Sequence, residues 1–218
     1  MILFFYIQNI IYICDMKNID KILVLLITLT ISNIVMGYTD YRNNSKTISI
    51  VVIGDFPKKD VEFVKNKLTI FYKCKVIVLH KIEIPKECKV KGLNKYKSID
   101  ILNILNKKFK NINGKVIGLT TVDICTDRFL NGKTNKNWGV LGLALLGKKP
   151  CIISNKRMKS NYYDKLEKVS IHEIGHSLGI PHCETNNECL MGDAKGKGSN
   201  IDKEKVWLCN DCKKKIKY

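Results

Sequence analysis

The hydrophobic positions of the chain predict strands and helices in alternation from about residue 46 onward. A β-branched run closed by a glycine is typical of a buried strand, whereas apolar residues at every third or fourth position indicate a helix. The pattern predicts strands at Thr47–Ile53, Lys75–Leu79, Lys115–Leu119, Gly139–Leu146 and Cys151–Ser154. It predicts helices at Val61–Phe71, from Ser98 as an N-cap, and from Asn161 onward. Such alternation favours a mixed sheet with helices packed on it, so the expected fold class is α/β or α+β.

The first 37 residues form a separate hydrophobic segment. Two apolar runs, Met1–Cys14 and Ile22–Met36, flank a polar stretch. Neither run reaches the ~18 to 20 uninterrupted apolar residues of a spanning helix. From Met16, however, lysines, an apolar stretch and small residues follow in the order of a secretory signal or an uncleaved anchor. We therefore expect an exported or membrane-anchored protein in which residues 1–37 associate with the membrane. The alternative is a cytoplasmic protein whose apolar tail packs on the domain formed by residues 46–218.

Composition indicates one globular domain with a large basic excess. The 218 residues are 45% hydrophobic and 27% charged, with only 14 glycines and 4 prolines, which excludes disordered and collagen-like chains. The formal net charge of +18 would normally suggest an anionic partner. Only Arg42, Arg128 and Arg157 are arginines, however, and base readout favours arginine over lysine. We therefore expect no specific nucleic-acid partner, and we expect a monomer.

Three histidines have the spacing of ligands to a catalytic zinc ion. At about 100° per residue, His172 and His176 lie about 40° apart on one face of a helix. Gly179 suits a helix end with positive φ, and Pro181 forbids helical continuation, so the chain can fold back after the helix. His182 would then join the other two imidazoles. Three imidazole ligands leave the fourth position of a tetrahedral zinc site open, as catalytic chemistry requires.

Glu173 is the candidate general base of this site. Zinc held by three neutral imidazoles lowers the pKa of a bound water to about 7 and can polarise a carbonyl group. A carboxylate beside the metal can take a proton from that water and pass it to a leaving amine. The pattern H-E-x-x-H-x-x-G-x-x-H has a chance expectation of about 10⁻⁵ in a chain of this composition. The residues therefore predict a zinc-dependent peptidase with a peptide or protein substrate.

Four cysteines near the C-terminus form a second candidate metal site. Cys183 and Cys189 follow the histidines, and Cys209 and Cys212 form a Cys-x-x-Cys pair. Two pairs of thiolates suit a closed, structural zinc site, which gives two zinc ions per chain. Such a site would tie the catalytic loop to the C-terminal segment and would supply folding energy only with metal bound. In an exported protein, the same four cysteines can instead form disulfides.

Together these motifs resemble those of the archaemetzincins, which are zinc metallopeptidases of the metzincin clan. The extended histidine motif is typical of the clan, and its continuation into Cys183, Cys189-x-Met191 and Cys209-x-x-Cys212 is typical of the family. The resemblance implies a mixed twisted sheet with packed helices, an active-site helix carrying the HExxH motif and a small zinc-bound C-terminal subdomain. The family usually has four residues between the first two cysteines, and this chain has five.

The resemblance implies two further site features. Met191 would belong to a turn that forms an apolar floor beneath the three histidines, although a buried methionine is also an ordinary core residue. In metzincins an edge strand above the cleft pairs with extended substrate, and the candidate residues here are Gly142, Leu143, Ala144 and Leu145. A buried sheet strand is an equally good interpretation of these four residues. Family members typically lack a signal or propeptide, so the hydrophobic N-terminus departs from the family pattern.

A non-catalytic role is the alternative to the peptidase. A basic module stabilised by zinc can bind anionic lipid or nucleic acid, with the histidines in a merely structural site. Its affinity for such partners would fall steeply with salt and would not depend on Glu173.

Overall fold

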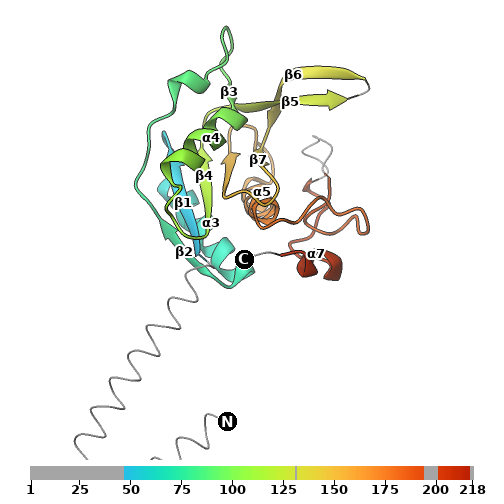
Figure 1. The fold of residues 1–218 in the computed structure, drawn as a ribbon. Coiled ribbons are helices and arrows are strands. Elements are labelled where there is room, and N and C mark those ends of the chain that lie inside the picture. Colours follow the sequence, from blue (N-terminus) through green and yellow to red (C-terminus); the bar gives the residue numbers. More distant parts are fainter. Residues whose placement is uncertain (1–46, 131, 194–200, 217–218) are drawn as a thin grey trace, which may run out of the picture. The chain divides into compact units, whose positions relative to one another are not determined.

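The computed structural model describes residues 47–130, 132–193 and 201–216, which belong to one compact unit, residues 45–218. At its centre lies a five-stranded sheet with the order β2-β1-β4-β8-β7 (Figure 1). Its strands are β1 (Thr47–Ile53), β2 (Lys75–Val78), β4 (Lys115–Thr120), β7 (Gly142–Ala144) and β8 (Pro150–Ser154). The first four strands in spatial order are parallel, and β7 runs antiparallel to β8 at one edge of the sheet. The mixed α/β fold expected from the hydrophobic pattern is confirmed.

The expected signal or anchor segment, residues 1–37, lies outside the described residues, so export and membrane association stay predictions. Within the described ranges, no helix has both the length and the apolar character needed to cross a membrane.

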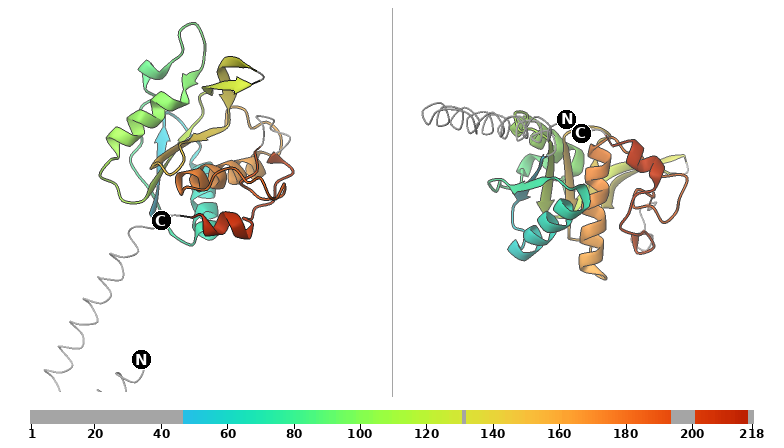
Figure 2. Two further views of the ribbon diagram at one scale, coloured as in Figure 1. Left: turned by 45° about the vertical axis from the view of Figure 1, so that its right-hand side comes forward. Right: turned by 90° about the horizontal axis from the view of Figure 1, so that it is seen from below.

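Helices cover both faces of the sheet (Figure 2). α3 (Lys58–Tyr72) and α5 (Tyr162–Ser177) pack on one face, and α4 (Ser98–Lys108) packs on the other. α3 extends the predicted helix at both ends. Successive side chains of a strand point to opposite faces. Ile50 of β1 therefore belongs to the core shared with α3 and α5, whereas Val51 belongs to the core shared with α4.

Burial on both faces explains why the central strands were predictable. Parallel strands covered by helices on both sides are near-continuous apolar runs, and their ends are marked by a change to polar residues. The four parallel strands lie where the pattern placed them, to within one residue at each end.

The region before β8 differs from the prediction. The expected single strand Gly139–Leu146 is wrong, because two strands belonging to different sheets share this stretch. β6 (Lys133–Val140) pairs antiparallel with β5 (Ile124–Leu130), and β3 (Tyr96–Lys97) pairs with β5 to complete a second, three-stranded sheet. The first half of β6 is exposed and polar, so the strand lacks the apolar alternation that would have revealed it. The β5-β6 hairpin projects beyond the edge strand β7 (Figure 1).

Ser98 does not cap α4 as expected. Lys97 occupies the N-cap position, and Ser98 is the first helical residue. The Ser98 side chain is buried, and its hydroxyl donates a hydrogen bond to the Cys125 carbonyl of β5 at 3.1 Å. A buried hydroxyl needs a hydrogen-bond partner. The Ser98 hydroxyl finds this partner in the neighbouring strand and not in the backbone of its own helix.

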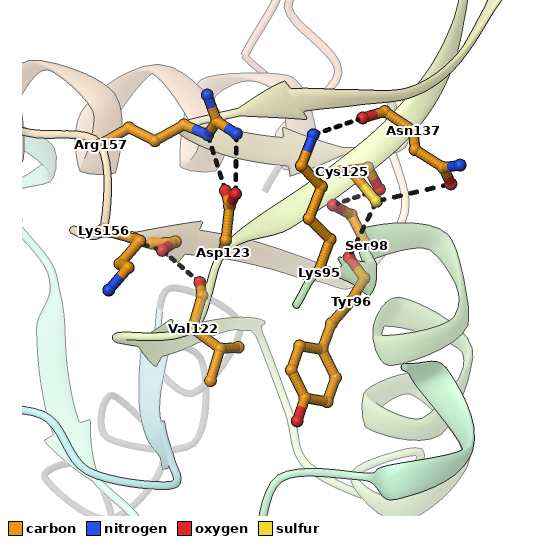
Figure 3. A network of polar contacts seen from close by, with 10 residues as sticks. Lys95, Tyr96, Ser98, Val122, Asp123, Cys125, Asn137, Lys156 and Arg157 are labelled. Atoms are coloured by element: carbon orange, nitrogen blue, oxygen red, sulfur yellow. Dashed lines mark hydrogen bonds and ion pairs between the residues drawn. The ribbon is translucent and has the colours of Figure 1, made fainter. Parts of the chain in front are cut away.

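A charged pair fastens the base of the hairpin to the loop after β8 (Figure 3). The Arg157 guanidinium donates two hydrogen bonds to the Asp123 carboxylate, at 2.6 and 2.7 Å. The same guanidinium crosses the β6 backbone so closely at Gly139 that a Cβ there would clash with it. Paired hydrogen bonds of this kind hold both the distance and the orientation of the two groups. The hairpin is therefore anchored at its base.

Gly114, which precedes β4, sets the start of the β1-β4 pairing. Its φ is +80°, and a Cβ at this position would collide with the carbonyl group of Thr47. Gly92 has a similar φ of +76°, but no atom lies within 4 Å of a Cβ built there. Substitution by alanine at either position should lower the free energy of unfolding by about 1 to 2 kcal/mol, because of the positive φ alone. We expect Gly114→Ala to lower the free energy of unfolding by about 3 kcal/mol or more, because backbone must move as well. Denaturant unfolding of both variants tests this, and equal losses would contradict it.

Candidate active site

The turn after α5 brings three histidines together. α5 ends at Ser177, and Gly179 adopts a φ of +92°, which confirms the helix end expected there. The amide of Ile180 then donates to the carbonyl of Gly175 at 3.0 Å, so the chain folds back against the last helical turn. His176 and His182 approach to 3.2 Å between their Nε2 atoms. His172 completes the group, with one ring nitrogen of each residue within 4.8 Å of the others.

Backbone carbonyls orient two of the imidazoles. His172 Nδ1 lies 2.7 Å from the Leu190 carbonyl oxygen, and His176 Nδ1 lies 2.8 Å from that of Ile180. A carbonyl oxygen can only accept, so each Nδ1 carries the proton and each Nε2 keeps its lone pair. Burial lowers the pKa of His172 to about 3 and also lowers that of His176, so both rings are neutral at ordinary pH. This donor set fits a zinc ion.

Glu173 lies beside the histidines, between α5 and the edge strand. Its side chain is buried, and it lines the same cleft as His172 and His182. A Cβ at Gly142 of β7 would come within 2.6 Å of the Glu173 Oε1 atom, so the absence of a side chain there makes room for the carboxyl group. Burial raises the pKa of Glu173 to about 8. A dication at the histidines would oppose that shift and favour the carboxylate.

Met191 packs against α5 at the level of the histidines. It is fully buried, and a Cβ on Gly175 would lie 2.5 Å from its sulfur atom. Gly175 stands between His172 and His176 in the helix, so the thioether contacts the backbone that carries both rings. Met191 is thus a buried residue packed on the helix between the two histidines, and its role as an apolar floor stays a prediction.

A cleft of about 520 Å³ opens beside the histidines. It is lined by the β5-β6 hairpin, by Leu141 and the edge strand β7, by Arg157 in the loop after β8, by α5 and His182, and by residues on either side of 194–200. Gly142 and Leu143 belong to the lining, whereas Ala144 and Leu145 do not. The residues of β7 form a partly buried strand at the edge of the sheet.

The hairpin contributes cleft residues that the sequence motifs did not identify. Thr126, Arg128 and Trp138 all line the cleft. No motif marks them, because their spacing follows a short, irregular hairpin with a register shift between Thr126 and Arg128. One compositional signal was available, since Arg128 is one of only three arginines among 38 basic residues.

The four cysteines lie together at the C-terminal end of the described chain. Their sulfur atoms lie within 4.8 Å of one another, and those of Cys183 and Cys209 are 3.7 Å apart. None of the four has a disulfide partner. Convergence of all four sulfurs suits one tetrahedral metal ion better than two separate disulfides, in which bonded sulfurs are about 2.05 Å apart. The additional residue between Cys183 and Cys189 does not prevent this convergence.

Hydrogen bonds shape the loop that carries these cysteines. The amide of Cys183 donates to the Met191 carbonyl at 2.7 Å, and the amide of Cys209 donates to the Cys189 sulfur at 3.4 Å. Burial raises the pKa of the Cys189 and Cys212 thiols. Burial acts in the same direction on Cys183, but hydrogen bonds from the Thr185 hydroxyl and nearby amides outweigh it and lower its pKa to about 6. A bound cation would favour the thiolate form of all four.

Comparison with known proteins identifies the family of this chain. The sequence matches the profile of peptidase family M54 over residues 30–218. An archaemetzincin of Methanocaldococcus jannaschii is 34% identical over 182 residues, which cover 78% of this chain and 92% of that protein. The crystal structure of the Archaeoglobus fulgidus archaemetzincin complexed with malonate matches with a TM-score of 0.63 at 28% identity, covering 78% of this chain and 99% of that one. The Methanopyrus kandleri archaemetzincin structure shares the fold, with a TM-score of 0.61 at 22% identity over 78% of this chain and 93% of that one.

The matched profile spans the sheet, the histidine group and the cysteine group, and the comparisons favour a peptidase over the non-catalytic basic module. The family profile covers most of the chain, and the matches to named archaemetzincins cover nearly the whole length of those proteins. The chain therefore belongs to the archaemetzincins, peptidase family M54, and is a zinc metallopeptidase.

Proposed function

We propose that this metallopeptidase holds its catalytic zinc with His172, His176 and His182 and uses Glu173 as the general base. One observation carries the proposal: three ring nitrogens converge beside a buried carboxyl group in the wall of an open cleft. Zinc bound by three neutral imidazoles lowers the pKa of a water molecule to about 7 and polarises a peptide carbonyl. The carbonyls that hold each Nδ1 proton keep His172 and His176 in the tautomer that such binding requires.

Glu173 is placed to move the proton. As a carboxylate it accepts a proton from the attacking water, and as a carboxylic acid it delivers that proton to the nitrogen of the leaving amine. Its burial between α5 and β7 keeps bulk water from competing for the carboxylate.

Edge strand β7 supplies the means to hold an extended substrate. It ends the order of the five-stranded sheet, and among the described residues no strand pairs with its outer edge. An extended peptide can therefore add to that edge through backbone hydrogen bonds. Gly142 and Leu143 place this edge in the same cleft as Glu173 and His182, so a bound peptide would cross the histidine group.

The role of Glu173 is tested by Glu173→Gln. Glutamine keeps the shape of the side chain but cannot accept the proton, so we expect kcat to fall by about 10² to 10⁴-fold. Zinc content by mass spectrometry and the unfolding midpoint should stay near those of the unmodified protein. Hydrolysis retained at the original rate would overturn the assignment of Glu173, and hydrolysis absent from the unmodified protein with a broad peptide library would support a non-catalytic module.

The four converging sulfurs lead us to propose a second, structural zinc ion, so the purified protein should contain two zinc ions per chain. His176→Ala should remove one ion with a modest change in stability, because the catalytic site keeps an open position and contributes less to folding. Cys212→Ser should remove the other ion and lower the unfolding temperature by several degrees, since a closed site contributes folding energy directly. Metal analysis together with a free-thiol count under reducing conditions measures both. A result of one zinc ion per chain, lost in His176→Ala, would contradict the proposal of a structural zinc site.

Gly142→Ala tests whether the position of the Glu173 carboxyl group depends on the absence of a side chain at residue 142 of β7. The added methyl group would displace the Glu173 carboxyl group, and a displacement of about 1 Å at a catalytic group can cost about 10²-fold in rate. We expect kcat to fall by that factor while the zinc content is unchanged. Gly132→Ala is the control for activity: its φ of +74° makes alanine cost about 1 to 2 kcal/mol of stability, but a Cβ there has no neighbour within 4 Å. A Gly142→Ala protein as active as the control would show that the carboxyl group does not depend on this contact.

A further inference from the structure

We propose that Arg128 binds a carboxylate group of the substrate in the cleft beside the histidines. The inference rests on the proposed peptidase function and adds to it the chemistry of the substrate. A peptide can present such a group in two places, as the side chain of an aspartate or glutamate or as its free C-terminus. Both present the same planar pair of oxygens to a guanidinium.

The hairpin places Arg128 in the cleft wall. Arg128 and Thr126 stand on the same face of β5, and Trp138 of β6 pairs directly with Thr126. All three line the cleft that also contains His182 and Glu173. The Arg128 guanidinium carbon lies 6.0 Å from the centre of the Trp138 ring, a geometry that favours a cation held over an aromatic face. The indole thereby orients the guanidinium without occupying its hydrogen-bond donors.

The other cations that line the cleft are already neutralised. Arg157 makes its two short hydrogen bonds to Asp123 (Figure 3). Lys168 pairs with Asp164 at 2.7 Å. Lys165 lies 3.5 Å from an Asp202 oxygen and also donates to the hydroxyl and carbonyl oxygens of Ser160. The charges of these three groups are therefore already compensated by carboxylates of the protein itself.

Arg128 differs from them in having no such partner. Within the described part of the chain, no ion pair or hydrogen bond joins its guanidinium to a carboxylate, although the side chain is half-buried in the cleft. A half-buried guanidinium has lost part of its hydration and has five donors to satisfy. The acidic residues of the cleft, Glu173, Asp193 and Glu204, come from other parts of the chain and not from the hairpin. An incoming carboxylate would therefore be attracted to the hairpin wall.

Binding is measured with peptides that differ only in one charged group. The protein carries Glu173→Gln so that peptides are not consumed, and fluorescence anisotropy reports binding of labelled peptides. One pair of probes has glutamate or glutamine at a single position, scanned along an otherwise neutral, C-terminally amidated peptide. The other pair is a neutral peptide with a free or an amidated C-terminus. We expect one of these pairs to show about 10- to 100-fold tighter binding of the carboxylate form, and which pair does so identifies the source of the carboxylate.

Substitution of Arg128 then tests the assignment. Arg128→Gln should reduce the ratio of affinities within the responsive pair to near 1, and Arg128→Glu should invert it, so that the uncharged member of the pair binds more tightly. Lys136→Gln is the matched control, because Lys136 is an exposed cation of the same hairpin that does not line the cleft. It should leave the ratio unchanged. A preference that survives Arg128→Gln, or no preference in either pair, would overturn the proposal.

The failure of this proposal is distinguishable from failure of the peptidase mechanism. With Glu173 restored, hydrolysis of neutral and acidic peptides at equal kcat/KM would leave the mechanism intact and refute the role of Arg128. A carboxylate preference in binding that depends on Arg128, without hydrolysis by any form of the protein, would support the subsite and refute the mechanism.

Discussion

Everything at the active site depends on the reversal of the chain at the end of α5. Continued helix would put His182 on a different face from His176, and no common ligand sphere would exist. Gly179, with its φ of +92°, allows the backbone to fold against the last turn, where the amide of Ile180 bonds to Gly175. The same turn presents the Ile180 carbonyl to the Nδ1 of His176. One change of backbone direction therefore positions one imidazole and fixes the tautomer of another.

The cysteine group supports the histidine group through the backbone that joins them. Cys183 follows His182 directly, and Cys189 is followed by Leu190, whose carbonyl orients His172, and then by Met191 beneath the helix. A metal ion that fixed the cysteines would therefore also fix the residues around the three histidines. The proposed second zinc ion would therefore do more than stabilise the fold, since it would restrain Leu190 and Met191, which contact His172 and the helix that carries it.

The elements that line the cleft belong to different parts of the fold. α5 and β7 belong to the main sheet and its packed helices, whereas the β5-β6 hairpin belongs to a separate small sheet anchored by the Arg157-Asp123 pair. The histidines and Glu173 thus lie on or directly after a helix of the main fold, and the residues proposed to select the substrate lie on the projecting hairpin. Such a division permits the hairpin to differ among related enzymes without disturbing the histidines.

The sequence by itself determined the parallel strands, the helices on the sheet and the identity of the candidate ligands. Those features depend on local periodicity and on fixed spacings within one helix and one turn, which are readable along the chain. Only the tertiary structure decided that the segment predicted as Gly139–Leu146 divides between two sheets, that Ser98 bonds to β5 and that Arg128 and Trp138 line the same cleft as His172 and His182. These outcomes depend on which distant strands meet, and the exposed, polar hairpin carries no hydrophobic pattern from which that meeting could be inferred.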